Sequence, residues 1–288
     1  MLVTRSHLAG DLETLGLRPG GLVMVHCRMS ALGHVVGGAE TVVHALLDVL
    51  GQECTLMAYT GWQDAPPDDL DVLDEGARRV YLDEQPAYDP RVALSRRDHG
   101  RVTEVLRTWP GALHSGHPEA GVAAVGPLAG EITASHPYDD AYGGGTPYAT
   151  LVEVGGQVAM LGAPLDTVTL VHHAEAVARV SGKRRVGYRY PVFEDGARVW
   201  LSFSDIDTSE GALPYERLIG EKDYVGYIAR SALAAGAGAS GPVGETTAYL
   251  FDARGLVGHA VGWIEHNFPS AARTRPSEDG PDISPAEA

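Results

Sequence analysis

The sequence contains only two cysteines, Cys27 and Cys54, in 288 residues, so it lacks the paired cysteines of a disulfide framework. We expect both thiols to be reduced, which fits the cytoplasm. No apolar run approaches the roughly 20 residues that a membrane-spanning helix needs. The first residues also lack the basic start and long apolar stretch of a signal peptide. We therefore expect a cytoplasmic protein with no membrane partner.

Positive charge is also scarce, because 22 lysines and arginines face 38 acidic residues and the formal net charge is −16. A phosphate backbone needs a basic footprint, so we expect no nucleic-acid partner. An acidic surface raises the local concentration of cationic solutes, which suits a positively charged ligand. Solubility alone is the competing explanation for the charge.

The composition that remains is that of a folded protein, with 44% hydrophobic and 21% charged residues. The length allows one large domain or two closely packed ones. We expect a single domain over residues 1–268 and a disordered tail over 269–288, where proline, serine, alanine and charged residues dominate.

Short apolar runs bounded by glycine alternate with amphipathic stretches, which predicts a layered α/β domain. Strands are expected over 22–26, 55–59, 122–126 and 157–161, and a hairpin pairs 186–192 with 198–203. Helices are expected over 4–15, 40–50, 77–82, 102–109, 167–180, 224–235 and 256–268. The segment 61–90 is acidic and proline-rich. It is interpreted as a lid or insertion too polar for a core, and 186–223 as a variable portion on the substrate side.

The helix expected over 167–180 carries the most informative pattern. Thr169, His172 and Glu175 are three residues apart and share one helix face. Asp166 stands where an N-cap residue belongs. A carboxylate one turn away can hold an imidazole and raise its basicity, which suits removal of a proton from an amine. The alternative is a helix-surface histidine with a purely local contact.

The segment 25–33 runs from a strand into a loop, and a helix follows. Backbone amides in such a loop can hold phosphate or pantetheine oxygens, and Arg28 can add a positive charge. An ordinary turn is the alternative, because the chain has neither a P-loop nor a G-x-G-x-x-G pattern. Cys27 is a candidate nucleophile, although cysteines at strand ends are more often packed than reactive.

Two further clusters admit other chemistry. His114 and His117 are spaced like metal ligands, and a metal-dependent hydrolase could use them with His172, His173 and Glu175. No further ligand follows at typical spacing, so we expect no metal. Acidic and aromatic side chains gather between positions 59 and 89, where they suit a polycationic sugar unless the segment is simply a solvated loop. They are Tyr59, Trp62, Asp64, Tyr81, Glu84, Tyr88 and Asp89.

Taken together, several stretches resemble the aminoglycoside 3-N-acetyltransferases, the antibiotic acetyltransferase family that is distinct from the GNAT fold. The resemblance covers about the whole of 8–268, and its specificity comes from the combination of stretches. They are Val25-His26 with Ser30 and Gly33, then 57–64, 88–90, 114–119, 161–169, 172–175 and 241–244.

The resemblance implies a mixed-sheet α/β/α sandwich with a smaller, variable substrate-binding portion. It implies that acetyl-CoA donates its acetyl group directly to the 3-amino group of the 2-deoxystreptamine ring, which gives antibiotic resistance. The family's catalytic histidine maps to His172, its acidic neighbour to Glu175, and a hydroxyl near the thioester to Thr169. The residues that map to the CoA cleft are His26, Arg28, Met29, Ser30, Ala31, Leu32, Ser115 and His117. Those that map to the aminoglycoside side are Tyr59, Asp64, Asp89 and Glu175.

The chain departs from the family pattern at Arg28, where a serine or threonine is common, at His114, where arginine is usual, and at Gly121, where serine is common. These positions bear on the CoA contacts. Alternatives that stay open are an acyltransferase of the same fold acting on another amine in biosynthesis and a non-enzymatic module that sequesters cationic sugars. A monomer and a homodimer are both compatible with the sequence.

Overall fold

A seven-stranded sheet forms the centre of the protein, for which the computed structural model describes residues 2–269. The tail expected over 269–288 lies outside the described residues beyond Pro269. In the middle of the sheet β7, β2 and β4 run parallel, and the flanking strands pair antiparallel. From edge to edge the strands are β10 Gly238–Val243, β11 Thr246–Asp252, β7 Gln157–Leu161, β2 Gly21–Cys27, β4 Cys54–Tyr59, β6 Val122–Val125 and β5 Leu113–His114.

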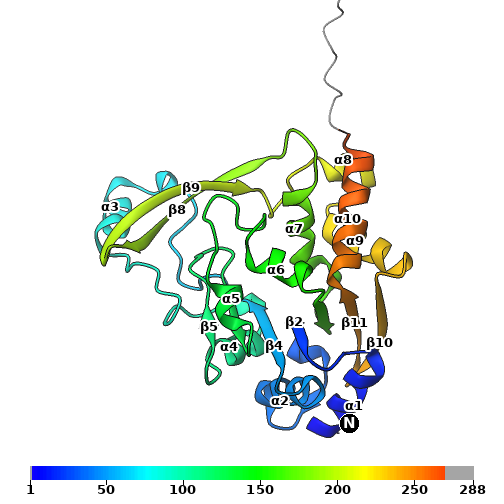
Figure 1. Ribbon diagram of the computed structural model, residues 1–288. Coiled ribbons are helices and arrows are strands. Elements are labelled where there is room, and N and C mark those ends of the chain that lie inside the picture. Colours follow the sequence, from blue (N-terminus) through cyan, green and yellow to red (C-terminus); the bar gives the residue numbers. More distant parts are fainter. Residues whose placement is uncertain (1, 270–288) are drawn as a thin grey trace, which may run out of the picture.

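Helices cover both faces of this sheet because its central strands are apolar on both sides (Figure 1). In β2, Leu22 and Met24 pack on one face and Val23 and Val25 on the other, as alternation along a strand requires. The first face carries α5 Ala129–Thr133, α6 Pro147–Glu153, α7 Leu170–Val177, α9 Tyr224–Ala234 and α10 Ala253–Asn267, and the second carries α1 Arg5–Leu15, α2 Gly38–Leu50 and α4 Arg101–Arg107. The expected mixed-sheet α/β/α sandwich is confirmed.

The strand order contains a switch point beside β2. The chain leaves β2 through α2 and enters β4 on one side, whereas β7 pairs with the opposite edge of β2. The helix before β4 covers one face and the helix before β7, α6, covers the other. Open α/β sheets bind ligands outside the carboxyl ends of strands at such a point. The topology therefore directs attention to the ends of β2, β4 and β7.

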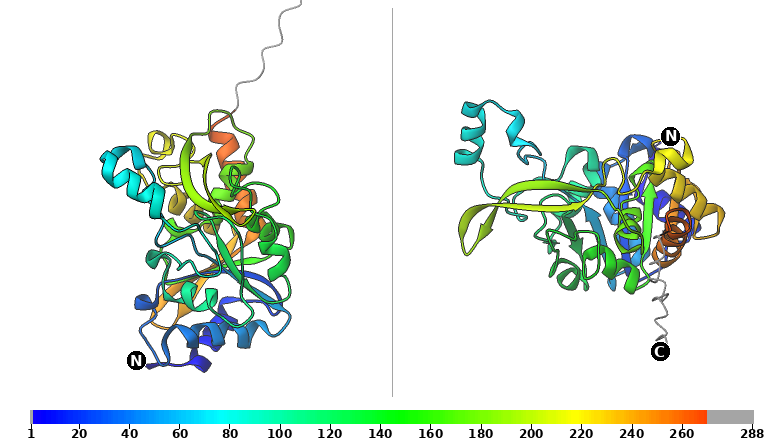
Figure 2. Two further views of the ribbon diagram at one scale, coloured as in Figure 1. Left: turned by 90° about the vertical axis from the view of Figure 1, so that its left-hand side faces the viewer. Right: turned by 90° about the horizontal axis from the view of Figure 1, so that it is seen from above.

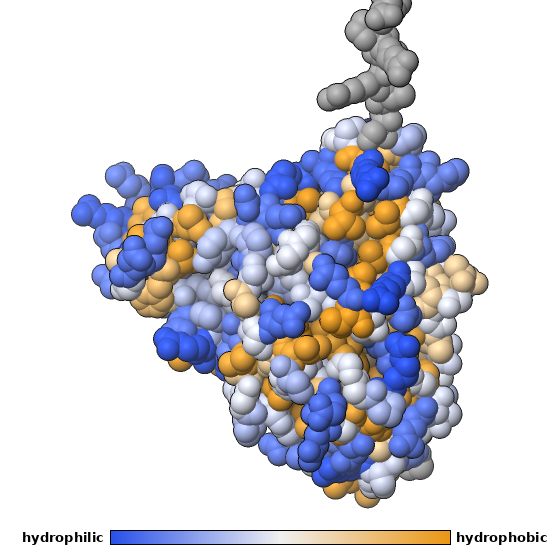
Figure 3. All heavy atoms as spheres, in the orientation of Figure 1, coloured by the Kyte–Doolittle hydropathy of each residue, from blue (hydrophilic) through white to orange (hydrophobic). Residues whose placement is uncertain are grey.

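A smaller portion projects from the sandwich to the left of Figure 1, and Figure 2 shows it from two further sides. It consists of the hairpin β8 Arg185–Glu194 and β9 Ala197–Ile206, together with the segment that contains α3 Glu75–Glu84. Four residues form its buried core: Trp62, Tyr88, Tyr190 and Val192. Apolar side chains also reach the surface here among hydrophilic ones (Figure 3), and Val72, Val80 and Phe193 are exposed.

The segment 61–90 is docked on this hairpin. The backbone N–H of Tyr88 donates to the carbonyl of Pro191, and the indole N–H of Trp200 donates to the carbonyl of Leu82. The expectation that the segment is too polar to enter a core is wrong for Trp62 and Tyr88, whose rings are buried and lie 5.3 Å apart. Two aromatic residues outweigh the acidic composition because they are placed where the hairpin can cover them.

Most expected elements are present with shifted ends, and some were missed. The helix expected over 167–180 extends only over Leu170–Val177, and the strands β10 and β11 were not predicted. The missed helix α6 had a readable signal, because Thr146 caps it and Pro147 occupies its first turn. None of the helices within residues 2–269 has both the length and the apolar character to cross a bilayer.

Candidate active site

A cavity of about 620 Å³ opens where β2, β4 and β7 end, at the switch point of the sheet. It contains residues from the loop after β2, from the segment before α4 and from the approach to α7. Its lining residues are His26, Cys27, Arg28, Met29, Ser30, Tyr59, Arg97, Asp98, His99, Gly100, Arg101, Thr103, Ala163, Pro164, Asp166, Thr167, Thr169 and His172. The cavity thus brings together Tyr59 and residues of the segments 25–33 and 161–169, all of which the sequence had indicated.

The expected contact between His172 and Glu175 is present on α7. Nδ1 of His172 lies 2.8 Å from Oε2 of Glu175. The side chain of His172 is 14% exposed and that of Glu175 is fully buried. A carboxylate can only accept, so Nδ1 carries the proton and Nε2 is the nitrogen left for a ligand. The imidazole is therefore held in one tautomer at the wall of the cavity.

Glu175 is buried within the sandwich, yet its carboxylate has several donors. Oε1 accepts from the backbone N–H of Ala212 at 3.0 Å, and Oε2 accepts from the hydroxyl of Tyr224 at 2.9 Å as well as from His172. A buried charge is costly unless hydrogen bonds compensate it. The sequence did not indicate Ala212 or Tyr224, because both lie far along the chain from α7.

The approach to α7 differs from the expectation in one respect. Asp166 lies in a 3₁₀ turn, Leu165–Thr167, and lines the cavity, whereas Thr169 occupies the N-cap position. Neither side chain caps the helix. Thr169 lines the same cavity as His172, and its hydroxyl makes no hydrogen bond to another described residue. That hydroxyl is consequently available to a bound substrate.

The loop after β2 is divided between cavity and core. Arg28, Met29 and Ser30 line the cavity, and Nε of Arg28 donates to the Ser30 hydroxyl at 3.3 Å. The side chain of Leu32 has no exposed surface and packs in the core, so it does not line the cavity. Ala31 is absent from the cavity wall, and its methyl group faces Gly162, where a Cβ would come within 2.7 Å of it.

Two arginines that the sequence did not single out, Arg97 and Arg101, join Arg28 at the cavity. All three side chains are exposed, so they remain hydrated and charged. Arg97 precedes α4 and Arg101 is its first residue, and this part of the chain approaches β2 closely because Gly100 has φ +88° and lies against the carbonyl of Cys27. A Cβ at this position would come within 2.7 Å of that oxygen. An acidic protein thereby presents a local cluster of positive charge.

Two side chains at the end of β2 have altered acid–base properties. Burial raises the pKa of the Cys27 thiol to about 12, so Cys27 is not a nucleophile near neutral pH. Burial, with a smaller contribution from nearby His99, lowers the pKa of His26 to about 3. Nε2 of His26 is buried and has no hydrogen-bond partner among residues 2–269. His26 is a neutral group with an unused nitrogen at the cavity.

Ser115 and His117 are not brought to this cavity. Both are buried beneath the β5–β6 edge. Nδ1 of His117 accepts from the backbone N–H groups of Glu119 and Ala120, and the Ser115 hydroxyl pairs with Nδ1 of His136 at 2.8 Å. Their polar atoms make hydrogen bonds within the protein. Both residues stabilise this turn, and neither lines the main cavity.

An acidic recess of about 410 Å³ adjoins the cavity and shares Arg97 and Asp98 with it. Asp68 and Glu119 also line the recess, together with Arg96, whose guanidinium lies 3.4 Å from the carboxylate of Asp98 and 4.0 Å from that of Glu119. Burial raises the pKa of the Glu119 carboxyl, which accepts a hydrogen bond from Tyr190 at 3.0 Å. The sequence did not indicate that Asp68, Asp98 and Glu119 lie around one recess, because the three residues belong to separate segments of the chain.

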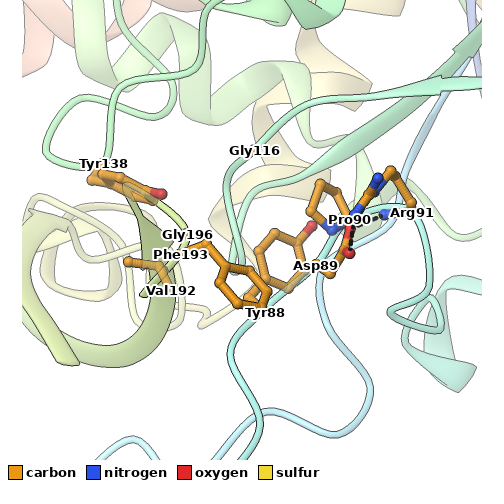
Figure 4. Close-up of a pocket in the computed structure, with 9 residues that line it drawn as sticks. All are labelled: Tyr88, Asp89, Pro90, Arg91, Gly116, Tyr138, Val192, Phe193 and Gly196. Atoms are coloured by element: carbon orange, nitrogen blue, oxygen red, sulfur yellow. Dashed lines mark hydrogen bonds and ion pairs between the residues drawn. The ribbon is translucent and has the colours of Figure 1, made fainter. Parts of the chain in front are cut away.

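The residues expected to contact the antibiotic lie in different parts of the structure. Tyr59 lines the main cavity, and its hydroxyl donates to the carbonyl of Glu119 at 3.1 Å. Asp64 is exposed and lines neither the main cavity nor the acidic recess. Asp89 lines a separate cavity of about 450 Å³ in the smaller portion, where Arg91 binds its carboxylate (Figure 4). Figure 4 shows Tyr88 and Tyr138 bordering this separate cavity.

The histidines of the metal-site interpretation do not come together. Nε2 of His114 lies 2.9 Å from the carbonyl of Arg107, Nδ1 of His173 lies 2.6 Å from the carbonyl of Tyr142, and His117 is buried elsewhere. Within residues 2–269 no group of three or more histidine, cysteine, aspartate or glutamate side chains has the arrangement of a metal site.

Of the three departures from the family pattern, Arg28 alone lines the main cavity. His114 is held at the β5 edge. At Gly121 a Cβ would come within 2.5 Å of the carbonyl of His117, so this turn has no room for a larger residue. The departures at His114 and Gly121 therefore affect the local packing of the turn and not the wall of the cavity.

With this geometry established, comparison with known proteins is decisive. The family model described as aminoglycoside 3-N-acetyltransferase matches residues 24–265. The chain belongs to the aminoglycoside 3-N-acetyltransferase family. It is an acyltransferase whose cosubstrate is acetyl-CoA and whose reaction is N-acetylation at the 3-amino group of an aminoglycoside, an activity that gives antibiotic resistance.

Relatives of this acetyltransferase match over nearly their full length. The aminoglycoside N(3)-acetyltransferase VIII of Streptomyces fradiae is 49% identical over 272 residues, which cover 94% of each chain. The crystal structure of aminoglycoside acetyltransferase AAC(3)-Xa has a TM-score of 0.90 and 45% identity, covering 93% of this chain and 94% of the other. A structure of AAC-IIIb in a binary complex with CoASH has a TM-score of 0.86 and 38% identity, covering 94% and 99%.

Proposed function

We propose that this enzyme transfers the acetyl group directly from acetyl-CoA to the antibiotic, with His172 as general base. The observation that carries the proposal is the 2.8 Å contact between Nδ1 of His172 and the buried carboxylate of Glu175, at the wall of the main cavity. The contact leaves Nε2 as the basic nitrogen. Glu175 stabilises the imidazolium that forms when Nε2 takes a proton.

In the reaction, one proton moves from the amine to the sulfur, and a carbon–nitrogen bond replaces the carbon–sulfur bond of the thioester. The amine nitrogen bonds to the thioester carbon while Nε2 of His172 accepts the amine proton. The carbon–sulfur bond then breaks, and the sulfur takes the proton from Nε2 of His172 and leaves as the CoA thiol, which restores the neutral imidazole. Thr169, at the start of α7, is positioned in the same cavity to donate its hydroxyl to the thioester oxygen as negative charge develops there.

In this proposal the two substrates occupy adjoining spaces, with CoA in the main cavity. Arg28, Arg97 and Arg101 supply the charge that CoA phosphates need, and the unused Nε2 of His26 can hydrogen-bond the pantetheine arm. The polyamine side is the acidic recess with Asp68, Asp98 and Glu119. The two cysteines are buried free thiols, which suits the cytoplasm, where we propose that the enzyme acts.

The test is thiol release from acetyl-CoA by His172→Gln, with gentamicin, neomycin, paromomycin and apramycin as separate acceptors. Removal of a positioned base typically slows a reaction by ~10²–10⁴-fold, so we expect kcat to fall within that range. The matched control is His34→Gln, which changes an exposed histidine outside the cavity and should leave kcat unchanged.

The position of the new amide in the product is then determined by NMR. A folded His172→Gln enzyme with near-normal turnover would contradict the role of the base. Acetylation of a different amine by the wild-type enzyme would instead point to a relative that acts on another substrate.

A further inference from the structure

Tyr224, the first residue of α9, lies against the buried carboxylate that holds the proposed base. Its hydroxyl donates to Oε2 of Glu175 at 2.9 Å, the same oxygen that accepts from Nδ1 of His172. The hydroxyl lies 3.4 Å from that nitrogen. Tyr224 therefore completes a compact group of three side chains, but it is absent from the wall of the main cavity and does not contact a substrate there.

A second tyrosine beside Tyr224 shows that ring packing and hydrogen bonding are separate here. The rings of Tyr215 and Tyr224 are stacked with centroids 4.2 Å apart and planes 3° apart. Both side chains are buried, yet the hydroxyl of Tyr215 has no hydrogen-bond partner among residues 2–269. The two residues offer the same apolar ring to the core and both hydroxyls interact with Glu175, but Tyr224 is the one whose hydroxyl makes the 2.9 Å hydrogen bond to Oε2.

The chain is built to keep the Tyr224 hydroxyl in place. Asp223 caps α9 by accepting from the backbone N–H of Gly226 at 2.6 Å, which fixes the helix start. At Gly211 the backbone has φ +85°, and a Cβ there would come within 2.8 Å of the Tyr215 ring and 2.9 Å of the Tyr224 ring. The close approach of this loop brings the N–H of the next residue, Ala212, to the other oxygen of Glu175.

The same loop is tied to the base of the hairpin. The backbone N–H of Arg184 donates to the carbonyl of Ala212 at 2.6 Å, and its guanidinium donates to the carbonyl of Gly211 at 2.8 Å. An ion pair of 2.8 Å joins Arg184 to Asp207 at the end of β9. The loop that supplies the Ala212 N–H to Glu175 is thus held in place by contacts that do not involve α7.

We propose that Tyr224 is a positioning residue, which holds the Glu175 carboxylate so that Oε2 keeps His172 in the Nδ1–H tautomer with Nε2 free to accept the amine proton. This inference rests on the proposed function of His172. Because Tyr224 shares Oε2 with the imidazole, it also moderates how strongly Glu175 stabilises the imidazolium. Tyr224 acts through Glu175 and leaves substrate binding to other residues.

Several other titratable groups surround the pair and stay constant in the test. The ring of Tyr142 lies 5.4 Å from the His172 ring, and Tyr215, the first residue of α8 Tyr215–Ile219, interacts with Glu175. Lys183 interacts electrostatically with Glu175 while its Nζ donates to the carbonyl of Ala176, and Asp207 interacts with Tyr224. None of these groups is altered by a change at Tyr224.

The experiment compares Tyr224→Phe with its stacking partner's variant, Tyr215→Phe, which is the matched control. Loss of the hydrogen bond should lower kcat about tenfold and leave both KM values within about twofold. The pH profile of kcat/KM should change more in Tyr224→Phe than in Tyr215→Phe, because Tyr224 shares Oε2 of Glu175 with Nδ1 of His172. Tyr215→Phe removes a hydroxyl that interacts with Glu175 without a close hydrogen bond to Oε2, so its effect on kcat and on the pH profile should be smaller than that of Tyr224→Phe.

A double-mutant cycle with Glu175→Gln tests the route of the effect. If Tyr224 acts through the carboxylate, Tyr224→Phe should change neither kcat nor the pH profile in the Glu175→Gln background. An unchanged enzyme after Tyr224→Phe alone, or an equal loss in both backgrounds, would overturn the inference. Either result leaves the general-base proposal intact, because that proposal is judged by His172→Gln.

A measurement on the wild-type enzyme covers the case in which Tyr224→Phe does not fold. ¹⁵N NMR of the imidazoles, with the His172 signal assigned by its loss in His172→Gln, reports which ring nitrogen carries the proton. The inference requires that the neutral imidazole of His172 is the Nδ1–H tautomer. A predominant Nε2–H tautomer would overturn it, since Nδ1 would then accept a hydrogen bond that Glu175 cannot donate.

Discussion

The sandwich and the smaller portion are stabilised in different ways. Two large apolar clusters fill the two faces of the central sheet, whereas the smaller portion has a buried core of four residues. The hairpin is joined to segment 61–90 by side-chain bonds to backbone carbonyls, such as those from Arg198 to Leu82, Asp83 and Gln85. Local stability follows apolar burial, so the smaller portion is the less rigid of the two.

This difference matches the division of chemical tasks. His172, the proposed base, and Thr169 stand on the sandwich, where the buried carboxylate of Glu175 accepts from His172, Ala212 and Tyr224. The acidic recess instead lies at the junction, where Trp62 and Tyr190 of the smaller portion meet Glu119 of the sandwich. A proton transfer needs fixed geometry, whereas recognition of a polyamine tolerates a lining that varies. The structure places the variable contacts away from the base.

The comparison is tested most strongly by removing one large apolar side chain from each region. Leu46→Ala in the sandwich should lower the free energy of unfolding by about 2–5 kcal/mol, because Leu46 is completely buried. Trp62→Ala should raise the antibiotic KM about tenfold with the acetyl-CoA KM unchanged, because Trp62 supports Tyr190 and the recess. Denaturant unfolding and steady-state kinetics measure the two effects. A selective loss of antibiotic binding in Leu46→Ala would contradict the division.

Acid should destabilise the turn that links the two regions, since His117 is buried and neutral there. Burial lowers the pKa of His117 to about 4, below its unfolded value of about 6.5. The unfolded chain therefore binds the extra proton first, and stability is lost as pH falls below about 6.5, by about 2 kcal/mol at pH 5. His117→Asn keeps an acceptor for the amides of Glu119 and Ala120 and should remove this part of the pH dependence.

The free energy of unfolding, measured by urea denaturation at pH 7.5 and pH 5, checks this prediction. The control is His266→Gln, which changes an exposed histidine at the end of α10. An equal fall in stability for His117→Asn and the wild type would show that other groups cause the acid sensitivity.

The smallest effect is expected at Asp89. Its carboxylate is paired with exposed Arg91 and lines a cavity separate from the one that contains His172. Asp89→Asn should change the melting temperature by less than about 1 °C, because exposed ion pairs contribute little. Antibiotic kcat/KM should stay within about twofold. A large rise in the antibiotic KM would instead bring Asp89 back to the substrate side, as the family resemblance implied.

Local sequence pattern was sufficient where neighbours along the chain decide the structure. The buried strands over 22–26 and 157–161 followed from apolar runs between glycines, and the contact of His172 with Glu175 followed from helical spacing. The strand β10 escaped because its residues, Gly238–Val243, have little apolar character of their own and depend on pairing with β11.

The site beyond α7 could be predicted only in part. The resemblance implies that Arg28, Met29 and Ser30 contact CoA, and they line the main cavity because they directly follow a central strand. It could not show that Leu32 is turned into the core or that Ser115 and His117 use their polar atoms inside the protein. Those outcomes depend on which side of a turn is covered, which a single sequence does not record.

The sequence by itself determined the alternating α/β layers, the family and the His172–Glu175 pair, because each depends on residues close together in the chain or on a combination of short motifs. Tertiary structure alone decided that Tyr224 and Ala212 hold the carboxylate and that Asp68, Asp98 and Glu119 surround one recess. The physical reason is that hydrogen bonds and charges act over a few ångströms. Groups from distant segments acquire these contacts only after the apolar layers have packed.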